Sequence, residues 1–513
     1  MNDESGPGVL DGEAGAPSAL SATLRRGAAI ATGIMVFTQL VSFAQTLVLA
    51  RLLSPVEVGW FAAGTVLSGF LVTCAEGGMA NALVQRKGRI DDVTATVFWA
   101  MLLAAIGWAA LALACAPLMS RIFDSDVVGL IAAASAGTII LHTLTYVPDA
   151  LMQRRFDFRA RYIVQPITVV SFAVTSVILC ANGFGVWGLV LASYCSVLLW
   201  LAASWSLAGW RPGTGGRPSF ALWRELAGFS LPLVVWHLVN QARDLLETAL
   251  VGAVFNAAAL GHYRYGRRLG ELPEIAVVDV GSYVLFPAFS RLAGDVERFR
   301  SAFLRALQVL WCVVIPIAGF IVAVGEPLVT VLLGEKWRGA GVMLVALAGT
   351  GPGVALTAIG LESIKGLGRT RLLHWVTIVG TVLGIGLLFA LLPLGLTGVG
   401  LALSVSSVAA GLLSLLLARR PAGVTMGELI ARLIPPVIVA APPAVALFLM
   451  EHLVAHSDQR GFLLGTTILL MEAVGYLVLY GMCLALLAPA SWRQISSVVR
   501  QMRHRDPSIQ EQT

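Results

Sequence analysis

Long apolar runs separated by short polar stretches form the pattern of this chain. The runs are continuous and mostly near 20 residues long, without the apolar–polar alternation of barrel strands. A helix of about 20 apolar residues spans the hydrocarbon core of a bilayer. It also satisfies its own backbone hydrogen bonds there. The pattern therefore predicts an all-α, polytopic membrane protein.

The apolar runs predict about fourteen transmembrane helices. They cover residues 27–50, 58–82, 94–117, 127–147, 163–182, 185–208, 229–252, 270–290, 303–325, 340–362, 372–394, 396–418, 434–455 and 462–488. The eighth, at 270–290, has the weakest pattern because it contains three acidic residues. The apolar stretch 326–337 is too short to span, and we expect it to lie at the interface or to re-enter.

The chain contains an internal repeat. Residues 49-LARLLSPVEVGWFA-62 align without a gap with 251-VGAVFNAAALGHYR-264, and Gly59 then falls on Gly261. Six predicted helices separate the two copies, so both copies begin on the same side of the membrane. This indicates two parallel six-helix lobes, followed by two C-terminal helices.

The predicted organisation follows from this repeat. Residues 1–23 contain no Lys or Arg, unlike the basic start of a signal peptide. The parts are a disordered cytosolic tail (1–26), an N-lobe with helices 1–6 (27–208), a cytosolic linker (209–228), a C-lobe with helices 7–12 (229–418), helices 13 and 14 (419–490) and a second cytosolic tail (491–513).

Composition and charge agree with this topology. The chain is 57% apolar and 12% charged, whereas soluble domains carry about 25% charged residues. With both termini in the cytoplasm, 26 of the 35 Lys and Arg residues fall on the cytoplasmic side, eight fall outside and Arg243 lies within a helix. This split follows the positive-inside rule. The basic loops explain the net charge of +6 without nucleic acid as a partner, and they favour anionic membrane lipid.

The sequence carries no pattern of a catalytic site. No loop is long enough for a soluble catalytic domain, and the Walker A, H-E-x-x-H and G-x-S-x-G motifs do not occur. The six cysteines lie in apolar runs without metal-ligand spacing. The glycine cluster 349–356 lacks the Lys of a phosphate loop and predicts a helix kink. We expect a protein that is not an enzyme and holds no metal or cofactor.

Charges inside the predicted spans are the first candidates for function. Arg243, Asp244 and Glu247 lie within about one helical turn, and residues four apart share a face. In one interpretation Arg243 pairs with an acid neighbour and stabilises packing. In the other the group lines a cavity, and an acid couples transport to H⁺ or Na⁺.

A second group, Arg264, Arg267 and Arg268, breaks the positive-inside rule at the outer end of the eighth helix. It forms either a solvated rim paired with Glu271 and Glu274, or a site that attracts a diphosphate, for which Arg suits bidentate contact.

The repeat adds further candidates. Glu76 and Asp279 lie deep in matching lobes, one residue apart after the repeat offset, and either bind H⁺ or Na⁺ or make polar packing contacts. Gln39 falls on Gln241, and these two residues and Arg51 are candidates for the cavity wall.

Four motifs stand out along the chain: 50-ARLLSPVEVGWF-61, 78-GMANALVQRKG-88, 259-ALGHYRYGRRLGELP-273 and 284-VLFPAFSRLAGD-295. They resemble the oligosaccharide-lipid flippases of the multidrug/oligosaccharidyl-lipid/polysaccharide (MOP) exporter superfamily, exopolysaccharide and lipopolysaccharide branch. Asp244 adds to the likeness, which covers about residues 25–420.

The resemblance implies a flippase in the bacterial cytoplasmic membrane. Such a protein moves an undecaprenyl-diphosphate-linked oligosaccharide from the inner to the outer leaflet by alternating access, beside polysaccharide polymerase and export machinery. Alternatives are a multidrug or cation antiporter of the same superfamily and a peptidoglycan-precursor flippase. A membrane glycan polymerase or ligase is a third, which the short loops disfavour.

Overall fold

A computed structural model describes residues 16–86, 90–155, 157–212, 216–369, 371–489, 491–494 and 496 of the chain. The description excludes the side chains of residues 16–32, 85, 158–161, 229–233, 236 and 274–284. Within the described residues the secondary structure is helical, and no strand occurs. The all-α prediction is therefore confirmed.

A helix lies at each of the predicted positions. The α-helices are α1 (Ala16–Leu52), α2 (Pro55–Glu76), α3 (Met79–Gln85), α4 (Asp91–Ile122), α5 (Asp126–Arg154), α6 (Phe158–Ala181), α7 (Val186–Ala208), α8 (Phe220–Val254), α9 (Ala257–Leu292), α10 (Val296–Leu333), α11 (Arg338–Ala346), α12 (Thr350–Gly366), α13 (Arg371–Leu391), α14 (Gly395–Arg419), α15 (Met426–Met450) and α16 (Phe462–Leu487). Short turns η1 (Glu335–Trp337), η2 (Leu392–Leu394), η3 (Glu451–Ala455) and η4 (Ser457–Gln459) connect some of them.

Several helix boundaries differ from the sequence prediction. α1 begins within the predicted tail, α8 begins within the predicted linker and α9 begins 13 residues before 270. The stretch 326–337, expected at the interface or re-entrant, mostly continues α10, because Val329, Val331 and Leu333 extend its buried apolar face. The predicted helix 340–362 breaks between α11 and α12, at the start of the glycine cluster.

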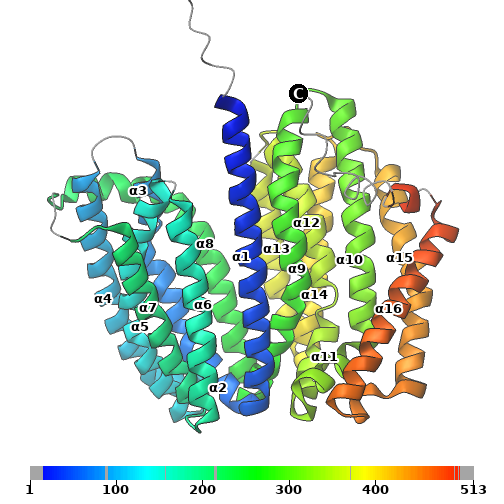
Figure 1. Ribbon diagram of the computed structural model, residues 1–513, viewed down its shortest axis with the longest axis horizontal. Helices are drawn as coiled ribbons and strands as arrows, with labels where there is room; N and C mark the ends of the chain where they lie inside the picture. The colour runs from blue at the N-terminus through cyan, green and yellow to red at the C-terminus, as the bar shows by residue number, and fades with distance from the viewer. Residues whose placement is uncertain are drawn as a thin grey trace, which may run out of the picture. The chain divides into compact units, whose positions relative to one another are not determined.

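The chain divides into two compact units, which we describe separately (Figure 1). The first unit contains Met1–Leu53 and Ala63–Leu246, and the second contains Ser54–Ala62 and Glu247–Thr513. The three boundaries fall near the repeat: one after α1, one after the first turns of α2 and one within α8. The first turns of α2 therefore belong to the second unit.

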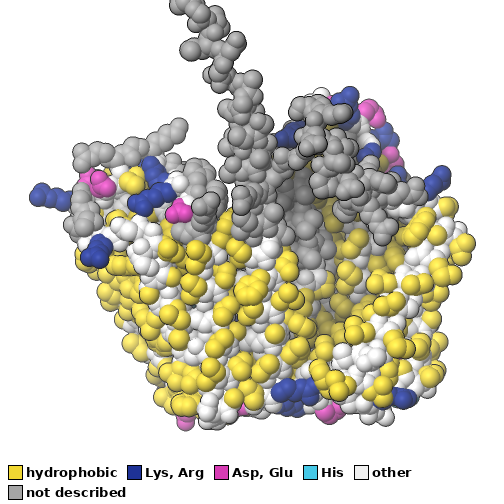
Figure 2. Space-filling view, in the orientation of Figure 1, with side chains coloured by type: hydrophobic (Ala, Val, Ile, Leu, Met, Phe, Trp, Pro, Cys, Tyr) yellow, Lys and Arg dark blue, Asp and Glu magenta, His cyan; other side chains and the backbone are white. Residues whose placement is uncertain are grey.

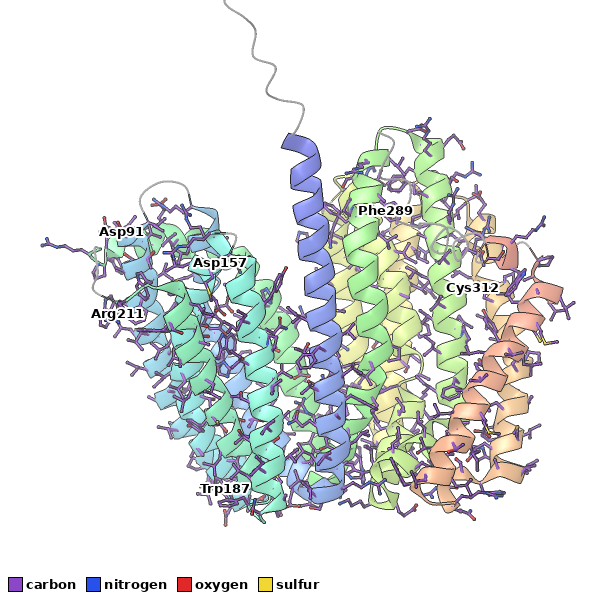
Figure 3. The ribbon with its side chains drawn as sticks, in the orientation of Figure 1. Asp91, Asp157, Trp187, Arg211, Phe289 and Cys312 are labelled. Atoms are coloured by element: carbon purple, nitrogen blue, oxygen red, sulfur yellow. The ribbon has the colours of Figure 1, made fainter. Side chains whose placement is uncertain are left out.

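Small residues allow the helices of the first unit to pack closely. α4 packs on α5, and α6 packs on α7. Ala105, Ala109 and Ala136 are buried around Ile139 in one of its cores, as expected where helix backbones approach in a membrane. Figure 3 shows Asp91, Asp157 and Arg211 at one end of this unit and Trp187 at the other. Its loops therefore alternate between two ends, as the helix count requires.

The second unit has α12 packed on α9 and α14, and α10 packed on α15 and α16. A Cβ on Gly360 of α12 would lie 2.2 Å from the Ser414 hydroxyl of α14, so the glycine allows the two helices to touch. Phe289 of α9, labelled in Figure 3, packs with Phe299 and Phe303 in a large apolar cluster.

The outer surface is apolar along the helices. Large hydrophobic side chains such as Leu463, Leu486 and Leu103 are 80%, 78% and 67% exposed. On the face shown in Figure 2, hydrophobic side chains cover the flanks, and charged side chains gather near the helix ends. Eleven helical segments of the described residues are long and apolar enough to cross a membrane, and one of them, Arg371–Arg419, contains both α13 and α14. This is a multi-pass membrane protein.

Candidate functional site

The polar turn in each repeat copy begins a new helix. Ser54 donates from its N–H and its hydroxyl to Glu57 Oε2, both at 2.8 Å, and Glu57 N–H donates back to the Ser54 hydroxyl at 3.3 Å. This is a capping box, with Pro55 at the first helical position, where its missing N–H is harmless. In the second copy, Asn256 caps α9 by accepting from Ala259 N–H at 2.8 Å.

The two copies contact each other within the second unit. A Cβ on Gly59 would lie 1.8 Å from the carbonyl oxygen of Ala257, and a Cβ on Gly261 would lie 2.0 Å from that of Pro55. In the alignment of the repeat, Gly59 matches Gly261 and Pro55 matches Ala257, so the contact is reciprocal. We call these four residues the glycine joint. The first turns of α2 and α9 cross there at a distance that only glycine permits.

A polar network on α8 and α9 lies beside this joint in the sequence. Arg267 Nη1 donates to the Tyr263 hydroxyl at 2.7 Å and to Glu247 Oε2 at 2.9 Å, and the Tyr263 hydroxyl donates to the same carboxylate at 3.0 Å. Arg267 Nε donates to Glu271 at 2.9 Å. We call these four residues the α8–α9 network.

The α8–α9 network joins a buried charge to a partly accessible one. The Glu247 side chain is 4% exposed and the Arg267 side chain 31%. The guanidinium also lies 5.9 Å from the centre of the Tyr263 ring. Two carboxylates and the Tyr263 hydroxyl therefore hold the Arg267 guanidinium in a set orientation.

The three arginines of the second predicted group differ in the structure. Arg267 pairs with Glu271, as the rim interpretation expects, and also with the buried Glu247. Arg264 is exposed, and Arg268 is half-buried. The side chain of Glu274 lies outside the described residues. The diphosphate interpretation stays a prediction.

A second polar cluster lies in the first unit, around Glu76. This half-buried acid interacts electrostatically with His237 of α8 and with Tyr146 of α5. One turn earlier, Thr73 accepts a hydrogen bond from Gln241 Nε2 at 3.2 Å. The structure therefore brings two predicted residues, Glu76 and Gln241, to neighbouring turns of one polar surface.

The remaining candidates take varied positions. Arg243 and Asp244 are half-buried and have interaction partners. Gln39 is half-buried and Arg51 is exposed. The side chain of Asp279 lies outside the described residues. Among the described residues, no group of three or more His, Cys, Asp or Glu side chains is arranged to hold a metal ion.

Sequence reasoning missed three polar groups. The Tyr263 hydroxyl was assigned only to the repeat, although it bridges Arg267 and Glu247. Glu451, in the turn η3 after α15, and Glu472 of α16 are 1% and 3% exposed, and neither was a candidate. An acid within an apolar run was the signal available for both, and the same criterion had selected Glu76.

Comparison with known proteins agrees with this geometry. The profile of the family "polysaccharide biosynthesis protein" matches residues 48–341, and that of "lipid II flippase MurJ" matches residues 218–469. The succinoglycan biosynthesis transport protein ExoT of Rhizobium meliloti (strain 1021) is 26% identical over 65% of this chain and 67% of that protein. The lipopolysaccharide biosynthesis protein WzxC of Escherichia coli (strain K12) is 23% identical over 60% of this chain and 62% of that protein.

Solved structures share the fold. The lipid II flippase MurJ in an inward closed conformation superposes with a TM-score of 0.70 at 13% identity, over 88% of this chain and 97% of that one. An inward-facing multidrug resistance MATE family transporter of the MOP superfamily gives 0.61 at 16% identity, over 75% and 94%. The chain has the fold of these transporters and, because the first profile covers more than half of its length, it belongs to the polysaccharide biosynthesis protein family.

Proposed function

We propose that this protein is a flippase that moves lipid-linked oligosaccharide repeat units across the cytoplasmic membrane for exopolysaccharide or lipopolysaccharide biosynthesis. The family match over residues 48–341 carries this proposal, since it includes both repeat copies and the α8–α9 network. The names of the relatives ExoT and WzxC point to the same pathway class.

The chemistry of the cargo explains the polar groups on α8 and α9. A sugar-diphosphate headgroup meets about 30 Å of hydrocarbon, where an unpaired charge costs many kcal/mol. Partly accessible arginines, such as Arg267 and Arg243, offset that cost by donating to the phosphates. The polyprenyl tail stays in the lipid. Alternating access exposes the headgroup site to one face at a time.

Topology and energy source complete the proposal. Both termini lie in the cytoplasm, as the distribution of basic residues favours. Transport is coupled to H⁺ or Na⁺ through one or more of four acids, Asp244, Glu247, Glu76 and Asp279. The polysaccharide polymerase and export machinery act on the product at the outer face.

A specific observation supports a second candidate, a flippase for the peptidoglycan precursor. The MurJ profile matches residues 218–469, and the MurJ structure superposes over 88% of this chain. That precursor is also a polyprenyl-diphosphate sugar, so the same basic groups would bind it. Cargo, and not mechanism, separates the two candidates.

Complementation separates them. The gene is expressed in a strain that lacks its exopolysaccharide flippase and in a strain depleted of its lipid II flippase. Restored polymer export in the first strain alone supports the proposal. Rescue of growth in the second strain alone would replace it with the peptidoglycan-precursor function. Rescue of neither strain, with the protein at normal level in the membrane, would reject both.

Arg243 tests the cargo path in the rescued strain. Arg243→Ala should abolish export at normal membrane abundance, and Arg243→Lys should restore it partly, because a point charge replaces a planar fork. If Arg243 only neutralises Asp244 or Glu247, the Ala variant loses protein level, and removing the acid as well restores both level and export. Arg420→Ala, at the end of α14, is the control for loss of a basic residue elsewhere in the chain.

A further inference from the structure

Two buried acidic side chains lie where the last two helices, α15 and α16, pack together. α15 and α16 pack on each other and on α10, and their shared core includes Val331, Leu447 and Tyr476. Glu451 follows the end of α15 and is 1% exposed, and Glu472 lies within α16 and is 3% exposed. Both carboxyl groups are therefore in an apolar setting, where an ionised form needs a compensating charge.

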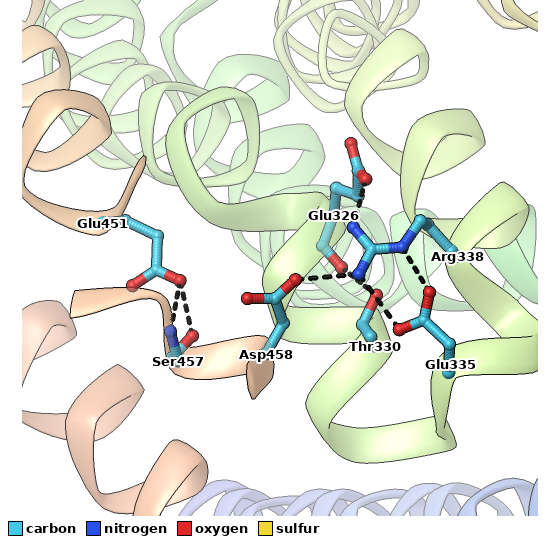
Figure 4. A network of polar contacts seen from close by, with 7 residues as sticks. All are labelled: Glu326, Thr330, Glu335, Arg338, Glu451, Ser457 and Asp458. Carbon is cyan, nitrogen blue, oxygen red and sulfur yellow. Dashed lines mark hydrogen bonds and ion pairs between the residues drawn. The ribbon is translucent and has the colours of Figure 1, made fainter. Parts of the chain in front are cut away.

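The turn between the two helices holds Glu451 in place. Its Oε1 accepts from the Ser457 N–H at 2.9 Å and from the Ser457 hydroxyl at 2.6 Å (Figure 4). Glu451 also begins the π-helical turn η3, a type of turn found frequently at functional sites. Its other oxygen, Oε2, is buried and has no donor among the described residues.

Glu472 lacks a donor on both oxygens. Each is buried without a hydrogen-bond donor among the described residues. The Glu472 carboxyl group lies near enough to that of Glu451 for the two to interact electrostatically. An ionised carboxylate only accepts hydrogen bonds, so the three unpartnered oxygens of the pair can gain a donor from each other only if one carboxyl group carries a proton.

The nearby basic groups are bonded to other acceptors. Arg338 donates to Glu326 at 2.8 Å, to Glu335 at 2.7 Å and to Asp458 at 2.8 Å (Figure 4). Three carboxylates thus surround one guanidinium, so this network offers the pair no surplus positive charge.

Arg460 and His452, which lie on the same elements, also bond to other groups. Arg460 donates to the backbone carbonyls of Ala455 and Val454. The His452 ring stacks on Phe448 and bonds to its carbonyl oxygen. Other titratable side chains on the packed elements include Lys336, His456, Tyr476 and Tyr480.

We propose that Glu451 and Glu472 form a proton-binding site that holds one shared proton at neutral pH. Two buried carboxyl groups that interact and lack donors do not both ionise, because desolvation and like-charge repulsion act in the same direction. The shared proton removes one charge and supplies the missing donor. The Ser457 bonds stabilise the charge that remains on Glu451.

A proton fits this site better than a metal ion. Hard cations such as Ca²⁺ take about six to eight oxygen ligands. The pair offers three carboxyl oxygens without a donor, and no third acid or histidine joins it in a ligand set among the described residues. The site uses none of the residues of the α8–α9 network and none of the acids predicted for ion coupling, and it does not depend on the cargo.

Protonation at this site affects how the last two helices dock. Loss of the proton would place two like charges between α16 and the turn at Ser457. Repulsion would then push Glu472 away from Glu451 and loosen the contact between α15 and α16. The pair is therefore a pH-sensitive element in a part of the chain where the sequence predicted only generic spans.

Infrared difference spectroscopy on the purified full chain in lipid nanodiscs tests the site. The protonated carboxyl C=O stretch is followed through a pH titration in potassium buffer, for the wild type, Glu472→Gln and Glu451→Gln. Glu335→Gln is the control, because the Glu335 side chain is 70% exposed and pairs with Arg338. Gel filtration confirms that each variant is folded, and the two site variants give independent tests if one of them fails to fold.

The expected result is a carboxylic-acid band at neutral pH that disappears in Glu472→Gln, disappears or shifts in Glu451→Gln, and is unchanged in Glu335→Gln. A band that persists unchanged in both site variants would overturn the proposal, as would a wild type without any such band at neutral pH. The titration is repeated with sodium in place of potassium. Loss of the band in sodium alone would assign the site to a metal cation and reject the proton.

Discussion

The two repeat copies share their joint but differ in charge. Gly59 and Gly261 make equivalent close contacts with the backbone of the other copy. Around them the side chains diverge. With the same alignment, Glu247, Tyr263, Arg267 and Glu271 of the second copy correspond to Gln45, Phe61, Thr65 and Gly69 of the first. The α8–α9 network therefore has no charged counterpart in the first copy.

The first copy uses one of these positions for neutral packing. Gln45 Nε2 donates to the Ser176 hydroxyl of α6 at 2.9 Å, where its counterpart Glu247 binds Arg267. The comparison separates two kinds of position. Those that match in both copies build the helix crossing, and those that acquired charge in one copy are where we expect the transport chemistry.

The largest effect is expected at the glycine joint. Gly261→Ala and Gly59→Ala each place a Cβ within about 2 Å of a carbonyl oxygen, so the backbone of α2 or α9 must move. Overpacking of this kind costs about 1–3 kcal/mol, occasionally more. We expect both variants to lose membrane abundance and thermal stability to a similar degree, measured by immunoblot and fluorescence-detected gel filtration after heating.

Matched glycines on the same helices serve as controls. A Cβ on Gly69 of α2 meets nothing within 4 Å, and one on Gly270 of α9 makes only contacts of 3.7 Å and longer. Alanine improves helix propensity by about 1 kcal/mol, so Gly69→Ala and Gly270→Ala should be neutral or stabilising. Equal stability of all four variants would show that the joint is not tightly packed.

The sequence predicted the fold well because the bilayer allows few solutions. Apolar runs near 20 residues must be helices, and a helix lies at every predicted position. Boundaries were less accurate where charges lie within a helix. The eighth helix was predicted to begin at 270, with Arg264, Arg267 and Arg268 at its outer end, but α9 already begins at Ala257. Pairing with partners on other helices, such as Glu247, offsets the cost of placing these charges in the first turns of α9.

The candidate site was predicted in part. A buried charge in an apolar run identified Glu247, and the exception to the positive-inside rule identified Arg267. Their pairing was not predicted, because they lie on different helices and the sequence does not show how α9 packs against α8. Glu451 and Glu472 show the same limit, since each was visible as a single acid but not as a pair.

The α8–α9 network gives the next largest expected effect. Arg267→Ala leaves the buried Glu247 without its cation, and breaking a buried pair in this way costs about 3–5 kcal/mol, less where one partner is partly exposed. We expect export to fall roughly tenfold or more, a loss of at least about 1.4 kcal/mol, with a smaller loss of protein. Quantified polymer beside a membrane blot measures both.

The matched change in the first copy is Thr65→Ala. Thr65 occupies the position equivalent to Arg267, and we expect near wild-type export from this variant. Equal loss of export from Thr65→Ala and Arg267→Ala would show that both copies contribute alike and would end the proposed division between them.

Tyr263→Phe should have a moderate effect. The first copy has Phe61 at this position, so the ring shape suits the joint, and only the hydroxyl is lost. Arg267 keeps its direct bond to Glu247, and the missing hydroxyl bonds cost about 1 kcal/mol. We expect a severalfold reduction in export and a small drop in melting temperature. An export defect as large as that of Arg267→Ala would mean that the hydroxyl itself contacts the cargo.

The smallest effect is expected at Gln45, the neutral counterpart of Glu247. Gln45→Leu removes the hydrogen bond to Ser176, but the Ser176 hydroxyl keeps its bond to the Ala173 carbonyl oxygen at 3.1 Å. No buried donor is left unsatisfied, so the cost stays at or below about 1 kcal/mol. We expect normal export with a slightly lower melting temperature, measured beside Glu247→Gln, which we expect to impair export because it removes the charge that holds Arg267. Loss of export in Gln45→Leu at normal abundance would place a transport residue in the first copy as well.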